Sequence, residues 1–277
     1  MDRIRLIATD LDATLLDAQG QLPPGFYEAV HALAQEGILF VAASGRPLPK
    51  LEEMFAAERA EMGFIADNGG IVCCRGETLA TSLMPREQLQ ALAKASHDAG
   101  KMGVLCALDA AYVEKPYAHL DSMMKRFYNR VEYVDSLADV DTPADKFSVY
   151  LPDGDAQRAY DELYGPAYVD SFSVAVAGPC WVDLMNRGVH KGAALATLGE
   201  RLGISPASMM AFGDTYNDAE MLETARYSFL VENGSLPLRE RAAFLAPPNT
   251  AYGVMQIVQK VLAQHGEVSP ADFTPAH

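Results

Sequence analysis

Residues 4–14 read Ile-Arg-Leu-Ile-Ala-Thr-Asp-Leu-Asp-Ala-Thr, and this stretch decides the fold of the 277-residue chain. The stretch from Ile4 to Thr9, apolar except for Arg5 and Thr9, predicts a short β-strand that ends at Asp10. Ligands of open α/β sheets bind at the carboxyl ends of the strands, so Asp10 and Asp12 follow the strand at the edge where chemistry is expected.

The same alternation of strand and helix continues through the first third of the chain and returns in the last third. A continuous apolar run predicts a strand buried on both faces at 38–43, and further strands are expected at 64–66, 209–212 and 227–231. Helical patterns fill the intervals, for example between Pro23 and Gly37, from Lys191 to Leu202, from Asn217 to Ala225, and from Tyr252 to Gln264. Strands that alternate with helices are typical of a doubly wound, Rossmann-like parallel sheet of the α/β class.

The middle of the chain has a different pattern. Helices are expected at 85–99 and 155–164, and strands at 147–151 and 172–176 alternate in polarity, as in a sheet with one solvated face. The sequence therefore predicts an α+β domain at 82–185, inserted into an α/β core formed by 1–81 and 186–277. Residues 266–277 hold two prolines and few apolar side chains, and a loose tail is expected there.

Charge and composition exclude several classes of protein. The chain has 37 Asp and Glu against 22 Lys and Arg, a formal charge of −15, which argues against a nucleic-acid binder and against docking on an anionic membrane. No apolar run is long enough to span a bilayer, and the start reaches Asp10 too early for a signal peptide, so a cytoplasmic protein is expected. The four cysteines include no Cys-x-x-Cys pair, and reduced thiols are expected.

Polar residues from distant parts of the sequence follow the predicted strands. Asp10, Asp12 and Asp214 are hard oxygen donors of the kind that bind Mg²⁺. A carboxylate can also attack phosphorus to form an aspartyl-phosphate, and a second carboxylate two residues later can serve as general acid and base. Ser44 supplies a neutral donor and Lys191 a positive charge, which suit the oxygens of a phosphoryl group.

These residues resemble the four motifs of the haloacid dehalogenase (HAD) superfamily. The motifs are Asp10-Leu11-Asp12-Ala13-Thr14, Ser44-Gly45-Arg46, Lys191-Gly192, and Gly213-Asp214-Thr215-Tyr216-Asn217-Asp218. Two further stretches, Asn68-Gly69-Gly70 and Tyr252-Gly253-Val254, resemble the Cof-type phosphatases of that superfamily. The interval of 147 residues between Ser44 and Lys191 matches an inserted class IIB cap domain.

The resemblance implies a role for each catalytic position. Asp10 is implied as nucleophile and Asp12 as general acid and base. Asp12 also favours hydrolysis of phosphate esters, because the dehalogenase branch lacks a carboxylate at this position and the transport ATPases carry threonine. Lys191 is implied to neutralise Asp10 and the phosphate.

The resemblance also implies how phosphate and metal are held. Ser44, Gly45 and Arg46 are expected to bind phosphate, together with Lys191 and Asn217. The Mg²⁺ ligands implied are Asp10, the backbone carbonyl of Asp12 and Asp214, with Asp218 supporting from behind or through water. Ala13 stands where glycine is more frequent, Ser44 where threonine is frequent, and Thr215 where glycine or serine is common, but none of these departures removes a functional group.

The sequence thus predicts a Mg²⁺-dependent phosphatase acting on a small phosphorylated metabolite, either a sugar phosphate or a phosphorylated cofactor. A phosphotransferase or phosphomutase using the same aspartyl-phosphate is the alternative, followed by a non-catalytic phosphate-binding protein. A phospho-accepting receiver domain does not fit the 147-residue interval, and no Gly-x-Gly-x-x-Gly follows the first strand. Four clustered aspartates would repel a phosphate, so the metal is expected to be obligatory.

The role of one basic segment of the insertion stays open at this level. The basic residues Lys115, His119, Lys125, Arg126 and Arg130 form either a contact for an anionic substrate or the solvated face of a helix. Trp181, the only tryptophan, is expected in the core of a strand. The oligomeric state and the individual substrate are not predicted.

Overall fold

A computed structural model describes residues 2–277, which form two compact units. The first, called here the core unit, comprises the chain up to Ser44 together with Met54–Ala80 and His190–His277. The second, the inserted unit, comprises Gly45–Glu53 and Thr81–Val189. No helix within residues 2–277 is long and apolar enough to cross a membrane.

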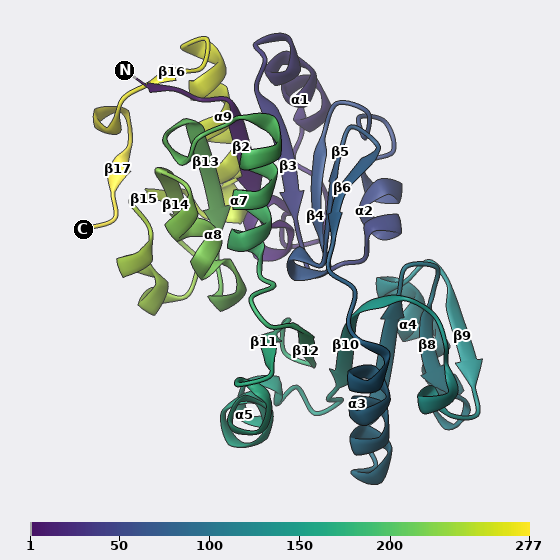
Figure 1. The fold of residues 1–277 in the computed structure, drawn as a ribbon. Coiled ribbons are helices and arrows are strands. Elements are labelled where there is room, and N and C mark those ends of the chain that lie inside the picture. Colours follow the sequence, from purple (N-terminus) through teal and green to yellow (C-terminus); the bar gives the residue numbers. More distant parts are fainter. Residues whose placement is uncertain (1) are drawn as a thin grey trace. The chain divides into compact units, whose positions relative to one another are not determined.

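The core unit is built on a nine-stranded sheet with the order β17-β15-β14-β13-β2-β3-β4-β5-β6 (Figure 1). The strands are β2 (Leu6–Thr9), β3 (Leu39–Ala43), β4 (Gly63–Ala66), β5 (Ile71–Cys74), β6 (Glu77–Thr81), β13 (Met209–Gly213), β14 (Tyr227–Val231), β15 (Phe244–Ala246) and β17 (Thr274–Pro275). The strands from β15 to β4 are parallel, and β2 lies between β3 and β13 although about 200 residues of sequence separate β2 from β13. This order is the doubly wound sheet expected from the strand and helix pattern.

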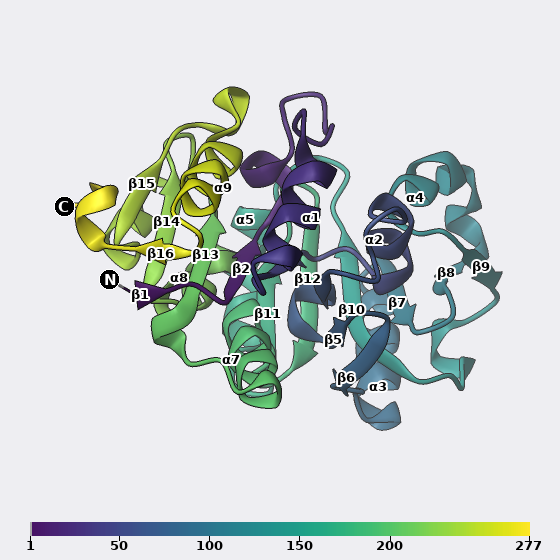
Figure 2. The same ribbon diagram turned by 90° about the horizontal axis from the view of Figure 1, so that it is seen from above.

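Helices cover both faces of the parallel strands (Figure 2). On one face lie α1 (Phe26–Gln35) and α9 (Gly253–Ala263), and on the other lie α7 (Lys191–Leu202) and α8 (Ala219–Thr224). Alternate residues of β2 face opposite helices: Leu6 and Ala8 join the apolar cluster beneath α7 and α8, which Ile7 does not. Burial of both faces explains why these strands are apolar throughout.

The inserted unit has its own six-stranded sheet with the order β11-β12-β10-β7-β8-β9, antiparallel except for the pair β8–β9. The strands are β7 (Met102–Ala107), β8 (Ala111–Glu114), β9 (Val131–Val134), β10 (Ala144–Tyr150), β11 (Phe172–Val176) and β12 (Trp181–Asn186). Its helices are α2 (Leu48–Met54), α3 (Arg86–Asp98), α4 (Asp121–Phe127), α5 (Ala156–Ala159) and α6 (Gly165–Tyr168). The mixed α+β content expected for the middle of the chain is confirmed.

The expected solvated face of the strand at 147–151 is wrong. Every residue of β10 except Tyr150 is buried, including Lys146 and Ser148. Ser148 Oγ donates to Asp183 Oδ1 at 2.6 Å, and Lys146 Nζ lies 3.3 Å from Asp183 Oδ2. The polar side chains on this face therefore satisfy one another inside the unit, which a pattern of alternation alone does not distinguish from exposure.

The basic segment of the inserted unit is a helical surface stretch with an apolar underside. Lys115 pairs with Asp135, Lys125 with Asp121 and Arg130 with Glu132, all with well-exposed basic side chains. These pairs favour the solvated-face interpretation over substrate contact. Trp181 is buried against Phe127 and Tyr150, as expected of a core residue.

The expectation of a loose tail at 266–277 is wrong. β16 (Glu267–Val268) pairs with β1 (Asp2–Arg3), and β17 pairs antiparallel with β15. Phe273 is buried, with its ring 5.0 Å from that of Phe229 and 5.4 Å from that of Phe244. A few well-placed apolar side chains and two short ladders order a segment whose average composition resembles a linker.

The tail makes a measurable contribution to stability. The substitution Phe273→Ala removes a buried ring from this aromatic cluster, and we expect it to lower the free energy of unfolding by about 3–5 kcal/mol. Urea unfolding followed by far-UV circular dichroism measures the change, with Leu236→Ala, an exposed position, as control. A near-zero effect of Phe273→Ala would contradict the docked tail.

Candidate active site

The carboxyl ends of two neighbouring parallel strands bring two predicted site residues together. Thr9 of β2 is in register with Phe212 of β13, and the Asp10 amide donates to the carbonyl of Phe212 at 3.0 Å. Asp10 follows β2 directly and Asp214 follows β13. The register of the sheet therefore places both carboxyl groups at one edge.

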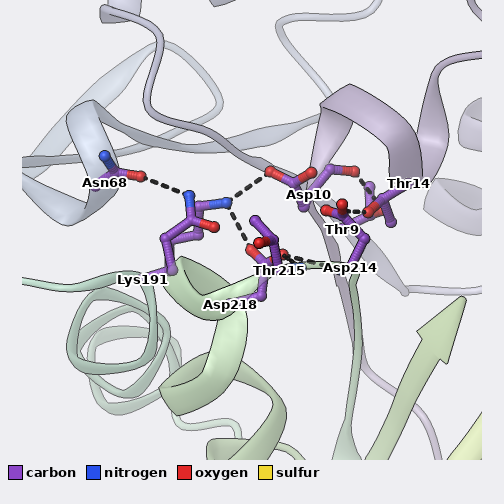
Figure 3. A network of polar contacts seen from close by, with 9 residues as sticks. Thr9, Asp10, Thr14, Asn68, Lys191, Asp214, Thr215 and Asp218 are labelled. Carbon is purple, nitrogen blue, oxygen red and sulfur yellow. Dashed lines mark hydrogen bonds and ion pairs between the residues drawn. The ribbon is translucent and has the colours of Figure 1, made fainter. Parts of the chain in front are cut away.

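Lys191 is the charged centre of the site (Figure 3). Its ammonium is fully buried and donates to Asp10 Oδ1 and to Asp218 Oδ1, each at 2.6 Å. Lys191 is the first residue of α7, whose amino end is capped by the ring of His190 accepting from the Ala193 amide at 3.1 Å. A cation at the positive end of a helix is unfavourable by itself, and here two carboxylates offset that placement.

Two glycines allow the motif segments to approach closely. A Cβ on Gly192 would lie 2.4 Å from the carbonyl oxygen of Glu220, and a Cβ on Gly213 would lie 2.4 Å from the Cβ of Asp218. Both distances are too short for any side chain, so glycine is required where α7 packs on α8 and where β13 meets the turn after it. Close packing at these points is what lets Lys191 reach across to Asp10.

Asp218 is engaged on both of its carboxylate oxygens. Oδ1 accepts from Lys191, while Oδ2 accepts from the backbone amides of Asp214 at 2.9 Å and Thr215 at 3.2 Å. Thr215 and Asp218 form a reciprocal capping box at the start of the following helical turn. Asp218 thus fixes the Asp214 backbone and Lys191 at the same time, which suits the expected supporting role better than direct metal ligation.

Three carboxylates form a group that fits a divalent cation. One oxygen each of Asp10, Asp214 and Asp218 lie within 4.8 Å of one another. Thr14 Oγ1 donates to Asp214 Oδ1 at 3.2 Å and orients that carboxylate. Carboxylate oxygens are the ligand type that Mg²⁺ prefers, and water and substrate oxygens commonly complete its coordination.

Burial and the neighbouring negative charges raise the pKa of two of these carboxyl groups, Asp10 and Asp214. Burial raises the pKa of Asp10 well above its usual range, with Asp218 and Asp214 adding to the effect and Lys191 opposing it. Burial and the Asp218 charge raise the pKa of Asp214 to about 7. Burial alone would lower the pKa of Lys191, but Asp10 and Asp218 outweigh it and raise that pKa. Lys191 is therefore held protonated, and its single positive charge is not enough to neutralise the carboxylates around it.

Asp12 lies in the turn Leu11–Leu15 that follows β2, and its side chain is exposed. Ala13, beside it, adopts φ = +61°, a left-handed conformation that glycine enters more easily than alanine. Asn233 Nδ2 donates to the Ala13 carbonyl at 2.7 Å and holds the turn. Asn233 therefore supports a turn in which alanine adopts a conformation that glycine enters more easily.

The remaining predicted phosphate-binding residues divide between the two units. Ser44 is buried at the end of β3, with its amide donating to the Ile65 carbonyl at 2.8 Å. Asn217 lies in the turn before α8, whereas Gly45 and Arg46 belong to the inserted unit. The core unit thus contains Ser44 and Asn217 together with the carboxylates and Lys191.

Two polar residues of the network were not singled out from the sequence. Thr14 orients Asp214, and Asn68 Oδ1 accepts from Asn217 Nδ2 at 3.2 Å. Both follow strand ends, in Asp10-Leu11-Asp12-Ala13-Thr14 and in Asn68-Gly69-Gly70, so their position was visible in the sequence although their contacts were not.

Comparison with known proteins identifies the family. The sequence model of haloacid dehalogenase-like hydrolases matches residues 7–258. The chain belongs to the haloacid dehalogenase-like hydrolase family. The family resemblance drawn from the motifs is therefore confirmed, as is the expected enzyme class of phosphate-monoester hydrolase.

Relatives of this hydrolase match it along almost its whole length. The 5-amino-6-(5-phospho-D-ribitylamino)uracil phosphatase YbjI of Escherichia coli (strain K12) is 30% identical over 265 residues, covering 94% of this chain and 96% of YbjI. The structure of SMU.1108c from Streptococcus mutans UA159 superimposes with a TM-score of 0.86 at 25% identity, covering 94% and 99% of the two chains. The HAD subclass IIB sugar phosphatase BT4131 shares the fold, with a TM-score of 0.76 at 20% identity and coverage of 92% and 98%.

The hydrolase should depend on Lys191 for stability. Replacing it by methionine leaves buried carboxylates without their cation, and we expect Lys191→Met to lower the free energy of unfolding by about 3–5 kcal/mol at pH 8. A carboxyl group whose pKa is higher in the folded than in the unfolded state destabilises the fold at pH values above its unfolded pKa. The loss in the free energy of unfolding caused by Lys191→Met should therefore shrink as the pH falls through 7 and the carboxylates become protonated. Urea unfolding across pH 5–8 measures both effects.

Lys94→Met is the matched control, because Lys94 forms an exposed ion pair with Asp98. It should change stability by less than about 1 kcal/mol at every pH. A Lys191→Met variant as stable as this control would contradict the central position of the lysine.

The hydrolase should also be stabilised by Mg²⁺ through Asp214. A ligand that binds only the folded state raises the unfolding temperature, and we expect millimolar MgCl₂ to do so in the wild type. Asp214→Asn removes one donor and one like charge, so it should be at least as stable as wild type without metal and should lose the Mg²⁺-induced shift. Differential scanning fluorimetry in MgCl₂ and in EDTA measures this, with Asp141→Asn, an exposed carboxylate, as control. An undiminished shift in Asp214→Asn would remove Asp214 from the ligand set.

Proposed function

We propose that this hydrolase is a Mg²⁺-dependent phosphatase that transfers the phosphoryl group of a small metabolite first to Asp10 and then to water. The observation that carries the proposal is the position of Asp10, which accepts a 2.6 Å hydrogen bond from the buried Lys191 ammonium and lies within 4.8 Å of the Asp214 donor atom. A carboxylate held between a fixed cation and a candidate metal ligand is suited to covalent transfer of an anionic group.

In the first step, a carboxylate oxygen of Asp10 attacks phosphorus and the bond from phosphorus to the ester oxygen breaks. Asp12, exposed in the turn after β2, donates a proton to the departing alkoxide. Ser44 and Asn217 donate to the phosphoryl oxygens, and Lys191 offsets their negative charge. The product is an acyl phosphate on Asp10 and a free alcohol.

In the second step, Asp12 accepts a proton from a water molecule that attacks the same phosphorus. The bond between phosphorus and the Asp10 oxygen breaks, and inorganic phosphate and the free carboxylate are regenerated. Because one residue acts as acid and then as base, Asp12 ends the cycle in its initial protonation state.

Asp10, the backbone carbonyl of Asp12 and Asp214 would hold the Mg²⁺, with Asp218 supporting them. When bound, the ion supplies positive charge that lets the phosphoryl group approach and stabilises charge developing on its oxygens. The clustering of three carboxylates around a single ammonium supports this proposed requirement.

For the substrate, we propose a small phosphate monoester such as a sugar phosphate or a phosphorylated cofactor precursor in the cytoplasm. YbjI, named for its action on 5-amino-6-(5-phospho-D-ribitylamino)uracil, makes that ester the first compound to test. We also propose that residues 82–185 serve as the cap domain that selects the leaving group, with Gly45 and Arg46 contributing to phosphate binding.

The covalent mechanism is tested by Asp10→Asn. We expect phosphate release from p-nitrophenyl phosphate to fall by at least about 1,000-fold, because an amide neither attacks phosphorus nor forms an acyl phosphate. Asp141→Asn should retain wild-type activity. Survival of turnover in Asp10→Asn would show that another nucleophile operates.

Metal dependence is tested on the same substrate. Extensive dialysis against EDTA should abolish phosphate release, and added MgCl₂ should restore it. Appreciable turnover after chelation would contradict the proposed requirement. A panel of phosphorylated metabolites scored by released phosphate then identifies the substrate class, and transfer to an added alcohol in preference to water would favour the phosphotransferase alternative.

A further inference from the structure

The turn Asp67–Gly69, which directly follows β4, has an unusual backbone. Its three residues all have positive φ, at +50° for Asp67, +55° for Asn68 and +110° for Gly69. Asparagine enters this left-handed region more readily than most residues, but two non-glycine residues in succession are costly and persist only where their surroundings impose them. Asp67 and Asn68 are buried, so the contacts that impose this backbone lie within the protein.

Gly69 connects the turn to the amino end of α7. A Cβ at position 69 would lie only 2.7 Å from the carbonyl oxygen of His190, the residue before Lys191. The backbone of the turn therefore packs against the backbone just before Lys191, where α7 begins.

Asn68 connects the turn to two other loops. Its backbone N–H donates to the Ser44 carbonyl at 3.0 Å. Its side-chain Oδ1 accepts from Asn217 Nδ2 at 3.2 Å, the bond drawn from Asn68 in Figure 3. Asn68 is only 1% exposed. The backbone and the side chain of Asn68 thus connect the residue after β3 with the turn that follows β13.

The second polar atom of the Asn217 amide, Oδ1, is buried and has no hydrogen-bond partner among residues 2–277. Rotation of both amides by 180° reverses the bond, so that Asn68 Nδ2 donates to Asn217 Oδ1 and the Asn217 NH₂ group takes the unpartnered position. In that orientation Asn217 has donors available for a phosphoryl oxygen. An amide at position 68 supports both orientations because it can either donate or accept.

We infer that the turn Asp67–Gly69 assembles the phosphate-binding loops, and that Asn68 is a positioning residue that orients the Asn217 amide toward the phosphoryl group. This inference rests on the proposed function, since it assigns Asn217 a phosphate oxygen. Asn68 itself acts through Asn217 and through the Ser44 backbone.

Asn68→Gly is the principal test, because glycine accepts positive φ and removes only the amide. We expect it to lower kcat/KM for p-nitrophenyl phosphate roughly tenfold and to weaken competitive inhibition by inorganic phosphate to a similar extent. Asn217→Ala should show the same losses. Because the two act as a unit, Asn68→Gly/Asn217→Ala should be no worse than the poorer single variant.

Asn68→Asp tests the orientation of the amide. A carboxylate at position 68 accepts hydrogen bonds but does not donate them. The Asn217 NH₂ group must then point toward position 68, and the Asn217 oxygen occupies the unpartnered position. Phosphate inhibition should therefore be at least as weak as in Asn68→Gly. Wild-type inhibition by phosphate in Asn68→Asp would overturn the inference.

His265→Gly is the matched control, because His265 has φ = +52° and an exposed side chain. It should leave kcat/KM and phosphate inhibition unchanged. Additive losses in the double variant, or an Asn68→Gly enzyme with a lower unfolding temperature but wild-type kinetics, would reduce Asn68 to a structural role.

Calorimetric binding of inorganic phosphate in MgCl₂ separates this inference from the proposed function. Active Asp10→Asn enzyme with weakened phosphate binding in Asn68→Gly would overturn the covalent mechanism and retain the positioning role. Inactive Asp10→Asn enzyme with unchanged phosphate binding in Asn68→Gly would do the opposite.

Discussion

The Lys191 ammonium is buried between the Asp10 and Asp218 carboxylates, and the arrangement of the candidate site depends on this three-way contact. Each partner reaches the contact from a different segment: the end of β2, the start of α7 and the turn before α8. Buried charges must be paired, so displacing the start of α7 would leave two carboxylates without their cation, and displacing either carboxylate would remove one of the lysine's two partners. The same contact that stabilises the core unit therefore also fixes the nucleophile proposed here.

The site is balanced between repulsion and attraction in a way that suits its proposed chemistry. Carboxylates outnumber cations within it, and burial, followed by the charge of Asp218, raises the pKa of Asp214 to about 7. A divalent ion relieves this repulsion and supplies charge for an anionic substrate in one step. The net charge of −15 therefore does not conflict with a phosphate ester as substrate.

Sequence patterns were most informative where geometry follows from topology. The proximity of Asp10 and Asp214 could be predicted from the sequence, because parallel neighbouring strands end at the same edge of a sheet. The role of Asn68 could not, because it depends on a left-handed turn and on a partner 149 residues away. The tail and strand β10 were misjudged for a related reason: a few long-range contacts, such as Phe273 in its aromatic cluster and Ser148 on Asp183, outweigh average composition.

The order of the strands also has a consequence for synthesis of the chain. The central pair β2–β13 joins residues 6–9 to residues 209–213, whereas the inserted unit uses no residue beyond Val189. During translation, the inserted unit can therefore complete its sheet while β2 still lacks its neighbour β13. The later segment with β16 and β17 pairs with β1 and with β15. One edge of the apolar strand β2 thus has no partner until β13 is made, and an unpaired apolar strand edge is prone to aggregation.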